Sequence, residues 1–101
     1  MKITLALLKR LPKVELHCHL DGSLRVPTII DLAEKQKVEL PSHDIDQLTK
    51  ILTIGKKRGT LEEYLKRFEI TLSVLQTPEA LVRVARELGE DAAAENVRYM
   101  E

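Results

Sequence analysis

Residues 11–24 read LPKVELHCHLDGSL, and this stretch decides how the rest of the chain is interpreted. Apolar and ionisable residues alternate through residues 14–20, and a period of two predicts a β-strand. Asp21, Gly22 and Ser23 then predict a turn at the carboxyl end of that strand. The strand has one apolar face and one ionisable face: Val14, Leu16, Cys18 and Leu20 against Glu15, His17 and His19.

His17 and His19 would lie about 6.6 Å apart along such a strand, with parallel side chains. Two imidazoles in this arrangement can lean onto one metal ion, which for zinc places each nitrogen at about 2.0–2.1 Å. Metal ligands at the carboxyl end of a strand are typical of the mouth of a parallel barrel. An ordinary half-exposed polar face would carry the same two residues, so spacing alone leaves both interpretations open. Cys18 points to the opposite face and is expected to be a small buried hydrophobe.

The composition is that of a globular protein without a broad charged field. Of 101 residues, 44% are hydrophobic and 32% are charged, and 16 basic side chains balance 16 acidic ones. A neutral chain attracts neither nucleic acid nor an anionic membrane, so we expect neither as a partner. No apolar run approaches the roughly 20 residues of a membrane span, and ITLALL, residues 3–8, is too short for a signal peptide. The single Cys18 excludes an intrachain disulfide and favours a cytoplasmic location.

Two short helices and a basic turn are predicted after the first turn. Pro27 suits a first helical position, and the amphipathic pattern behind it ends near residue 37. A second short helix is expected over residues 44–52, after a Pro-Ser break. The run GKKRG, residues 55–59, predicts a solvated turn. His43 lies between the two helices and is expected to be a surface or capping residue and not a metal ligand.

Two longer helices follow, each with a cap at its start. Thr60 and Glu63 form a capping-box pattern, and an apolar stripe comes next, made of Leu61, Tyr64, Leu65, Phe68 and Leu72. Thr77 caps the longest helix, which is expected to span about residues 78–95. Residues at about 97–101 are expected to form the first part of a second strand. A helix that leads directly into a strand is typical of the crossover in a parallel βαβ unit.

These elements predict one incomplete domain over residues 1–101, with its first strand at about residues 14–20. A usual βαβ unit takes about 30 residues, whereas about 75 separate the strands here. The extra segment, about residues 22–76, is therefore a helical insertion. Because it leaves from the carboxyl end of the first strand, where barrel active sites lie, we expect it to form a lid over the site.

Three runs of sequence resemble a known family: PKVELHCHLDGSLR at residues 12–25, GTLEEYLKRFEITL at 59–72 and NVRYME at 96–101. They are similar to the amino-terminal portion of the adenosine and adenine deaminases, a branch of the zinc amidohydrolases, and most similar to the adenosine deaminases. The resemblance implies an α/β fold, namely the amino-terminal part of a TIM-type (β/α)8 barrel. It also implies one Zn²⁺ per complete chain, a purine nucleoside as partner, and hydrolytic deamination of adenosine to inosine with release of ammonia.

The same resemblance assigns roles to residues of this chain. It makes His17 and His19 zinc ligands, places His19 beside the substrate, and brings Asp21 to the ribose hydroxyls. Adenosine-type members carry aspartate at this position and adenine-type members tend to carry glutamate, so Asp21 favours a nucleoside. By itself, an aspartate before Gly22 is a turn former. The family's further zinc ligands, its glutamate proton donor and its second active-site histidine match nothing here, so no catalytic residue is expected within this chain.

The stripe on the third predicted helix has two interpretations. Such a stripe usually packs against neighbouring helices. In the resembled deaminases the matching helix borders the substrate pocket, and a flat heterocycle favours apolar and aromatic walls. The substrate-binding candidates on this helix are Leu61, Tyr64, Leu65 and Phe68.

The length of the chain bears on what the whole protein is, and three hypotheses are considered. A TIM-type barrel needs about 250 residues, so we expect this chain to be the amino-terminal part of an enzyme and to be inactive alone. A second hypothesis is another metal-dependent amidohydrolase, such as adenine deaminase. A third is a non-enzymatic helical binding module that keeps the strand without its metal. The oligomeric state is not predicted.

Overall fold

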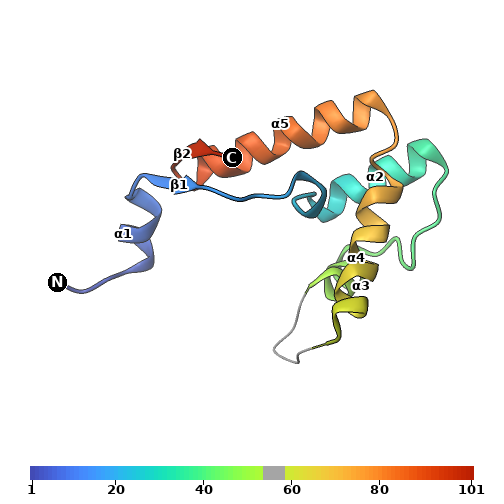
Figure 1. Cartoon of the computed structure of the whole chain (residues 1–101), viewed down its shortest axis with the longest axis horizontal. Coiled ribbons are helices and arrows are strands. Elements are labelled where there is room, and N and C mark those ends of the chain that lie inside the picture. Colours follow the sequence, from blue (N-terminus) through green and yellow to red (C-terminus); the bar gives the residue numbers. More distant parts are fainter. Residues whose placement is uncertain (54–58) are drawn as a thin grey trace.

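The computed structural model describes residues 1–53 and 59–101 (Figure 1). The helices are α1 (Leu5–Arg10), α2 (Val26–Gln36), α3 (Ile45–Leu52), α4 (Leu61–Ser73) and α5 (Pro78–Ala94). The strands are β1 (Lys13–Glu15) and β2 (Val97–Met100), and a 3-10 turn, η1, spans Leu20–Gly22. Most of the predicted basic turn, residues 55–58, lies outside the described residues. Among the described helices, none has the length and hydropathy that a membrane span requires.

β1 and β2 pair as parallel strands, which confirms an α/β chain with two parallel strands and helices between them. Val14 lies opposite Tyr99 and Glu15 lies opposite Met100, with a register shift after Lys13. α5 precedes β2 directly and packs against it. The helix of the βαβ unit therefore lies where the sequence pattern predicts it.

The prediction of a strand over residues 14–20 is wrong at its carboxyl end, because β1 stops at Glu15. A strand needs a hydrogen-bonded partner as well as an extended backbone. Beyond β1, the Glu101 amide donates to the Glu15 carbonyl at 2.8 Å, and the Cys18 amide donates to the Glu101 carbonyl at 2.9 Å. Residues 16–19 make no further strand pairing within the described chain, although His19 keeps an extended backbone, with φ −90° and ψ 120°.

The helix starts follow their cap residues. At the start of α4, Thr60 Oγ1 accepts a hydrogen bond from the Glu63 amide at 3.2 Å. At the start of α5, Thr77 Oγ1 accepts one from the Ala80 amide at 3.1 Å. Asp44 caps α3 in the same way. Each cap satisfies an amide that the first helical turn leaves without an intrahelical partner, so these boundaries are set by local sequence.

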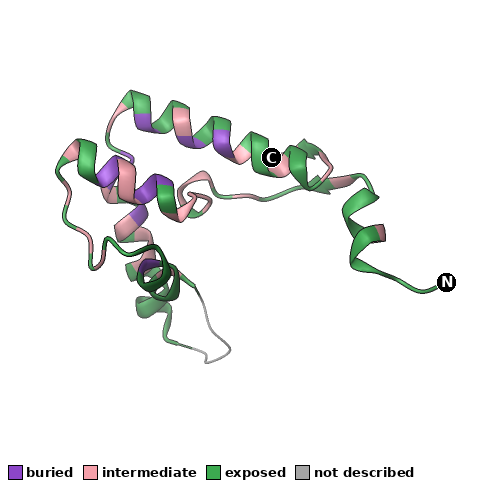
Figure 2. Cartoon of the chain, turned by 180° about the vertical axis from the view of Figure 1, so that it is seen from behind, coloured by how far each residue is buried: buried purple, intermediate pink, exposed green. Residues whose placement is uncertain are grey.

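The buried core lies among the helices and not beneath the two strands (Figure 2). It is formed by α2, α3, α5 and the segment after α4, through Ile29, Leu32, Ala33, Leu48, Val74, Leu75, Ala80 and Val84. In the strands, by contrast, Val14 is 63% exposed and Tyr99 is 52% exposed. α1 buries none of its residues. The helices of the predicted insertion thus form the hydrophobic centre of the described chain together with α5.

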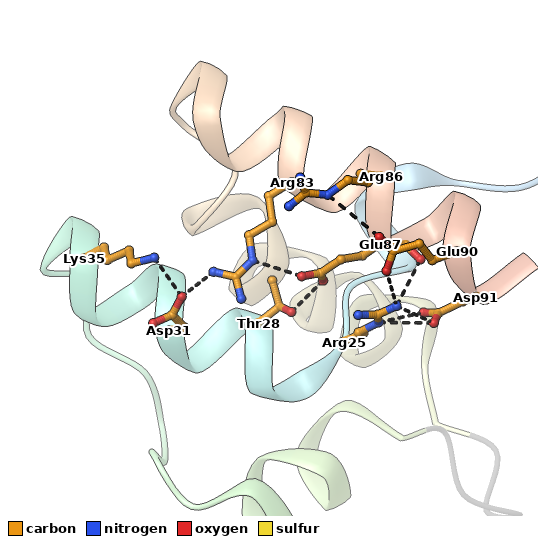
Figure 3. A network of polar contacts seen from close by, with 9 residues as sticks. All are labelled: Arg25, Thr28, Asp31, Lys35, Arg83, Arg86, Glu87, Glu90 and Asp91. Atoms are coloured by element: carbon orange, nitrogen blue, oxygen red, sulfur yellow. Dashed lines mark hydrogen bonds and ion pairs between the residues drawn. The ribbon is translucent and has the colours of Figure 1, made fainter.

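Polar side chains join α2 to α5 beside this core (Figure 3). Thr28 Oγ1 donates to Glu87 Oε2 at 2.6 Å, and Arg83 Nε donates to Glu87 Oε1 at 2.9 Å. Burial raises the pKa of Glu87, but the hydrogen bonds from Thr28 and Arg83 outweigh burial and leave its pKa below the usual range. Arg83 and Lys35 also bind Asp31 and lower the pKa of that carboxyl. Both carboxylates are therefore charged at neutral pH and fix the two helices in one register.

Replacing Val84 by Ala should lower the free energy of unfolding by about 2 kcal/mol, because this 1% exposed side chain loses two buried carbons and leaves a cavity. The matched control is Val82→Ala on the same helix, where the side chain is 67% exposed and the change should stay within about 0.5 kcal/mol. Equilibrium urea unfolding measures both. Equal losses in the two variants would show that α5 does not bury this face.

Candidate metal and substrate site

The candidate site is the extended segment of residues 16–19 together with η1. On one side, the Cys18 amide ties the segment to the Glu101 carbonyl. On the other side, the His19 carbonyl accepts hydrogen bonds from the Ser23 hydroxyl at 2.6 Å and from the Gly22 amide at 3.3 Å. These bonds close the turn directly behind His19 and fix the direction in which its side chain leaves the backbone.

The imidazoles of His17 and His19 converge on each other. Their Nε2 atoms lie 3.0 Å apart, and their ring centroids lie 5.0 Å apart with an interplanar angle of 23°. Two neutral imidazoles at this distance form an N–H···N hydrogen bond when one tautomer donates and the other accepts. The same convergence also presents two nitrogen lone pairs to one point when both Nε2 atoms are unprotonated.

This pair fits a tetrahedral metal ion. Two nitrogens at about 2.0–2.1 Å from one zinc ion would lie about 3.3 Å apart in tetrahedral coordination. The separation of 3.0 Å in the structure therefore needs to open by only a few tenths of an ångström. Both side chains are exposed, so an ion can reach them from solvent without rearrangement of the core.

Cys18 does not join the histidine pair. Its half-buried Sγ lies 3.5 Å from the hydroxyl oxygen of Ser23. Within residues 1–53 and 59–101, no group of three or more His, Cys, Asp or Glu side chains is arranged to hold a metal ion. His43 is exposed in the loop between α2 and α3. The described residues thus offer two imidazoles to a metal and not a complete site.

Asp21 lies on η1 next to the histidines. Its Oδ1 is 3.6 Å from Nδ1 of His19, which is ion-pair distance but too long for a hydrogen bond. The Asp21 side chain is 35% exposed. Its carboxylate therefore lies beside the Nδ1 edge of the His19 ring and still has lone pairs available for a ligand at the same rim.

A cavity of about 240 Å³ opens beside η1, between α2, α3 and α4. Its wall consists of Gly22, Leu24, Val26, Ile29, Thr49, Leu52, Thr53, Tyr64, Arg67, Phe68 and Thr71. The rings of Tyr64 and Phe68 pack edge to face, with centroids 5.5 Å apart. A Cβ atom at Gly22 would lie 3.2 Å from Phe68 Cε1, so the absence of a side chain at Gly22 lets α4 approach the turn.

Only part of the predicted stripe on α4 borders this cavity. Tyr64 and Phe68 line it, whereas Leu61 is 72% exposed and Leu65 is 52% exposed and neither belongs to its wall. Leu72 is exposed as well. The face that α4 turns toward η1 is therefore shifted around the helix from the apolar stripe.

Sequence reasoning missed Arg67 and Thr71, which share the cavity wall with Tyr64. Their positions, three and seven residues after Tyr64, have the spacing of one helix face, but their polar character concealed it. Arg67 Nε donates to the Ile51 carbonyl at 3.1 Å and so ties α4 to α3. For Ser23 the sequence indicates only a turn, and no local pattern signals the bond from its hydroxyl to the carbonyl of His19.

Comparison with known proteins gives a consistent result along the chain. The family described as adenosine deaminase matches residues 12–101. An adenosine deaminase from Shewanella woodyi is 55% identical over 91 residues, which cover 90% of this chain and 28% of that relative. Adenosine deaminases from Clostridium perfringens and Vibrio vulnificus are 54% and 55% identical over 94 and 91 residues, covering 93% and 90% of this chain.

The chain spans about 28% of the length of the curated relatives that it matches. The matched region includes the extended segment with both histidines, the η1 turn, all helices from α2 to α5, and β2. The family that the sequence resembles is thereby confirmed, and the chain belongs to the adenosine deaminase family.

Proposed function

We propose that these residues form the amino-terminal part of a zinc-dependent adenosine deaminase, which converts adenosine and water to inosine and ammonia. The observation that carries the proposal is the convergence of the His17 and His19 Nε2 atoms to 3.0 Å on an exposed rim. The relatives that match this region bear the name adenosine deaminase. The reaction requires a strong nucleophile at neutral pH, and a nitrogen-ligated metal is suited to provide one.

The fold proposal is that β1 and β2 are the first two strands of a (β/α)8 barrel. Their parallel pairing with α5 as crossover supports this. So do their exposed apolar side chains, such as Val14 and Tyr99, because further strands and helices would cover these surfaces. In such a barrel the histidines follow the carboxyl end of the first strand. The segment from η1 to α4 then borders the mouth as a lid, and residues 1–101 alone are inactive.

Zinc would be held by His17 and His19 together with ligands from outside the described residues. When bound, zinc lowers the pKa of a coordinated water to about 7 and so supplies hydroxide for hydrolysis. The part of this chain is to place two neutral imidazoles on one ion and to keep them oriented. The hydrogen bonds of Ser23 and Gly22 to the His19 carbonyl serve that orientation.

Asp21 is proposed to bind the sugar of the substrate. A carboxylate accepts hydrogen bonds from sugar hydroxyls, and charge-assisted bonds are stronger than neutral ones. Its position on η1, 3.6 Å from the ring of His19, places sugar recognition beside the metal. His19 would then lie between metal and nucleoside and contact both. This arrangement favours a nucleoside substrate over a free base.

The purine is proposed to lie against α4. Tyr64 and Phe68 face the turn that carries Asp21, and they supply an aromatic wall. Leu61 and Leu65 lie on an exposed part of the same helix and are available to close over the heterocycle.

A cytoplasmic location remains a prediction from the cysteine content.

Replacing His17 or His19 by Ala should remove both zinc and deaminase activity, because each removes one of the two ligands that this chain provides. The test uses a full-length chain with residues 1–101 at its amino terminus, completed with the remaining part of the Shewanella woodyi relative. Metal content is measured by mass spectrometry and activity by ammonia release. Cys18→Ala, between the two histidines, is the matched control and should keep both. Retention of stoichiometric zinc by either histidine variant would refute the ligand assignment.

Replacing Asp21 by Ala in the same full-length chain should reduce kcat/KM for adenosine by about 10- to 100-fold, the equivalent of one charge-assisted hydrogen bond. Turnover of free adenine should fall much less, since it has no sugar to bind. Asp46→Ala, which removes an exposed aspartate from α3, should leave both substrates unaffected. Equal losses for nucleoside and base would remove the proposed sugar contact.

A further inference from the structure

Arg25 connects the segment after η1 to α5. It is the N-cap residue of α2 and follows η1 by three residues, so its backbone marks the point where the turn becomes a helix. Its side chain crosses to the carboxyl-terminal half of α5 (Figure 3). Asp91, its main partner there, lies 66 residues away in sequence.

The contacts of Arg25 use the edge of its guanidinium that carries Nε and Nη2. Nε donates to both carboxylate oxygens of Asp91, at 3.2 and 3.1 Å, and Nη2 donates to Oδ1 of Asp91 at 2.7 Å. Nη2 also donates to Glu90 Oε2 at 3.2 Å and to the Glu87 backbone carbonyl at 3.4 Å. The hydrogen bond from Arg25 lowers the pKa of Asp91, so the pair stays charged at neutral pH. A lysine could not reproduce this multidentate geometry.

The exposure of the pair indicates that its main effect is on position. The Arg25 side chain is 38% exposed and that of Asp91 is 50% exposed. Ion pairs this accessible to water contribute little to the free energy of unfolding. A guanidinium that binds one carboxylate through two nitrogens nevertheless restricts the angle and distance between the backbones of the two residues, here Arg25 and Asp91.

A short chain of contacts leads from Arg25 to the histidines. Ser23, two residues before Arg25, donates its hydroxyl to the His19 carbonyl at 2.6 Å. The Ser23 amide donates to the Leu20 carbonyl at 3.1 Å, and the Gly22 amide donates to the carbonyl of His19 at 3.3 Å. Asp21 lies within this closed turn. A shift of residue 25 relative to α5 therefore moves the turn that carries Asp21 and the carbonyl that orients His19.

We propose that Arg25, held by Asp91, is a positioning residue for substrate binding, which sets the place of the Asp21 carboxylate beside the histidine pair. The inference rests on the proposed function, because it gives Asp21 its role in holding the nucleoside. Arg25 itself touches neither substrate nor metal. Its contribution depends on the rigidity of the connection from α5 to the turn.

The kinetic test uses Arg25→Ala in the full-length chain described above. KM for adenosine should rise about tenfold while kcat changes by less than about twofold, since misplacement affects a binding group. In an Asp21→Ala background the same replacement should change KM little, because the group it positions is gone. Arg86→Ala is the matched control, because it removes an exposed arginine of α5 that pairs with Glu90 at 3.8 Å and leaves the bonds from Arg25 to Asp91 in place.

Hydrogen exchange provides a readout that does not depend on catalysis. The amides of Gly22 and Ser23 should exchange about tenfold faster in Arg25→Ala than in the parent. In Arg86→Ala their exchange rates should be unchanged. Arg25→Lys is the second variant, for use if the alanine variant folds poorly. It keeps the positive charge but cannot bind Asp91 through two nitrogens, so the Gly22 and Ser23 amides should again exchange faster. If the parent lacks adenosine turnover, the proposed function fails, and exchange still decides whether Arg25 holds the turn. Unchanged exchange, or an equal rise in KM with and without Asp21, would overturn the inference.

Discussion

One short stretch of chain, residues 87–101, holds both ends of the segment that carries the histidines. Its final residues pair with β1 and reach the Cys18 amide through the Glu101 carbonyl. Its first residues bind the guanidinium of Arg25 on the other side of η1. Between these two anchors, His17, His19 and Asp21 are exposed or half-buried, whereas Leu20 and Leu24 pack against the core. The two anchors and the packing of these leucines therefore set the geometry of the segment.

The residues that stabilise the fold are therefore different from the residues proposed to bind the metal. The apolar core lies among α2, α3, α5 and the segment after α4, and the charged carboxylate of Glu87 lies between α2 and α5. The imidazoles lie outside that core, and His19 is 64% exposed. Removing an exposed imidazole costs little buried area, so loss of metal in a histidine variant reports on ligation and not on unfolding. Gly22 connects the two regions, because the ring of Phe68 packs where a side chain would otherwise lie.

Sequence alone predicted those features that depend on neighbouring residues. Thr60 and Thr77 cap α4 and α5 as their spacing indicated, because a cap is satisfied within three residues. The convergence of His17 with His19 follows from the same short range, since alternate residues of an extended backbone share a face. The motif also pointed to the family that the chain matches.

Features that depend on distant partners were not predictable in this way. The end of β1 is set by pairing with β2, about 85 residues away, and not by the alternation that continues to Leu20. The face that α4 turns toward η1 depends on where Gly22 lies. The apolar stripe alone therefore predicts only part of that face, namely Tyr64 and Phe68. Arg25 carries no local signal, because its partner Asp91 lies on another helix. The roles of Leu61 and Leu65 toward substrate stay predictions.

The most direct measurement of the central claim is a crystal structure of the full-length chain with anomalous diffraction collected on both sides of the zinc absorption edge. The account predicts one zinc peak within about 2.0–2.1 Å of the Nε2 atoms of both His17 and His19. A zinc peak bound by other residues, with these two imidazoles hydrogen-bonded only to each other, would contradict it.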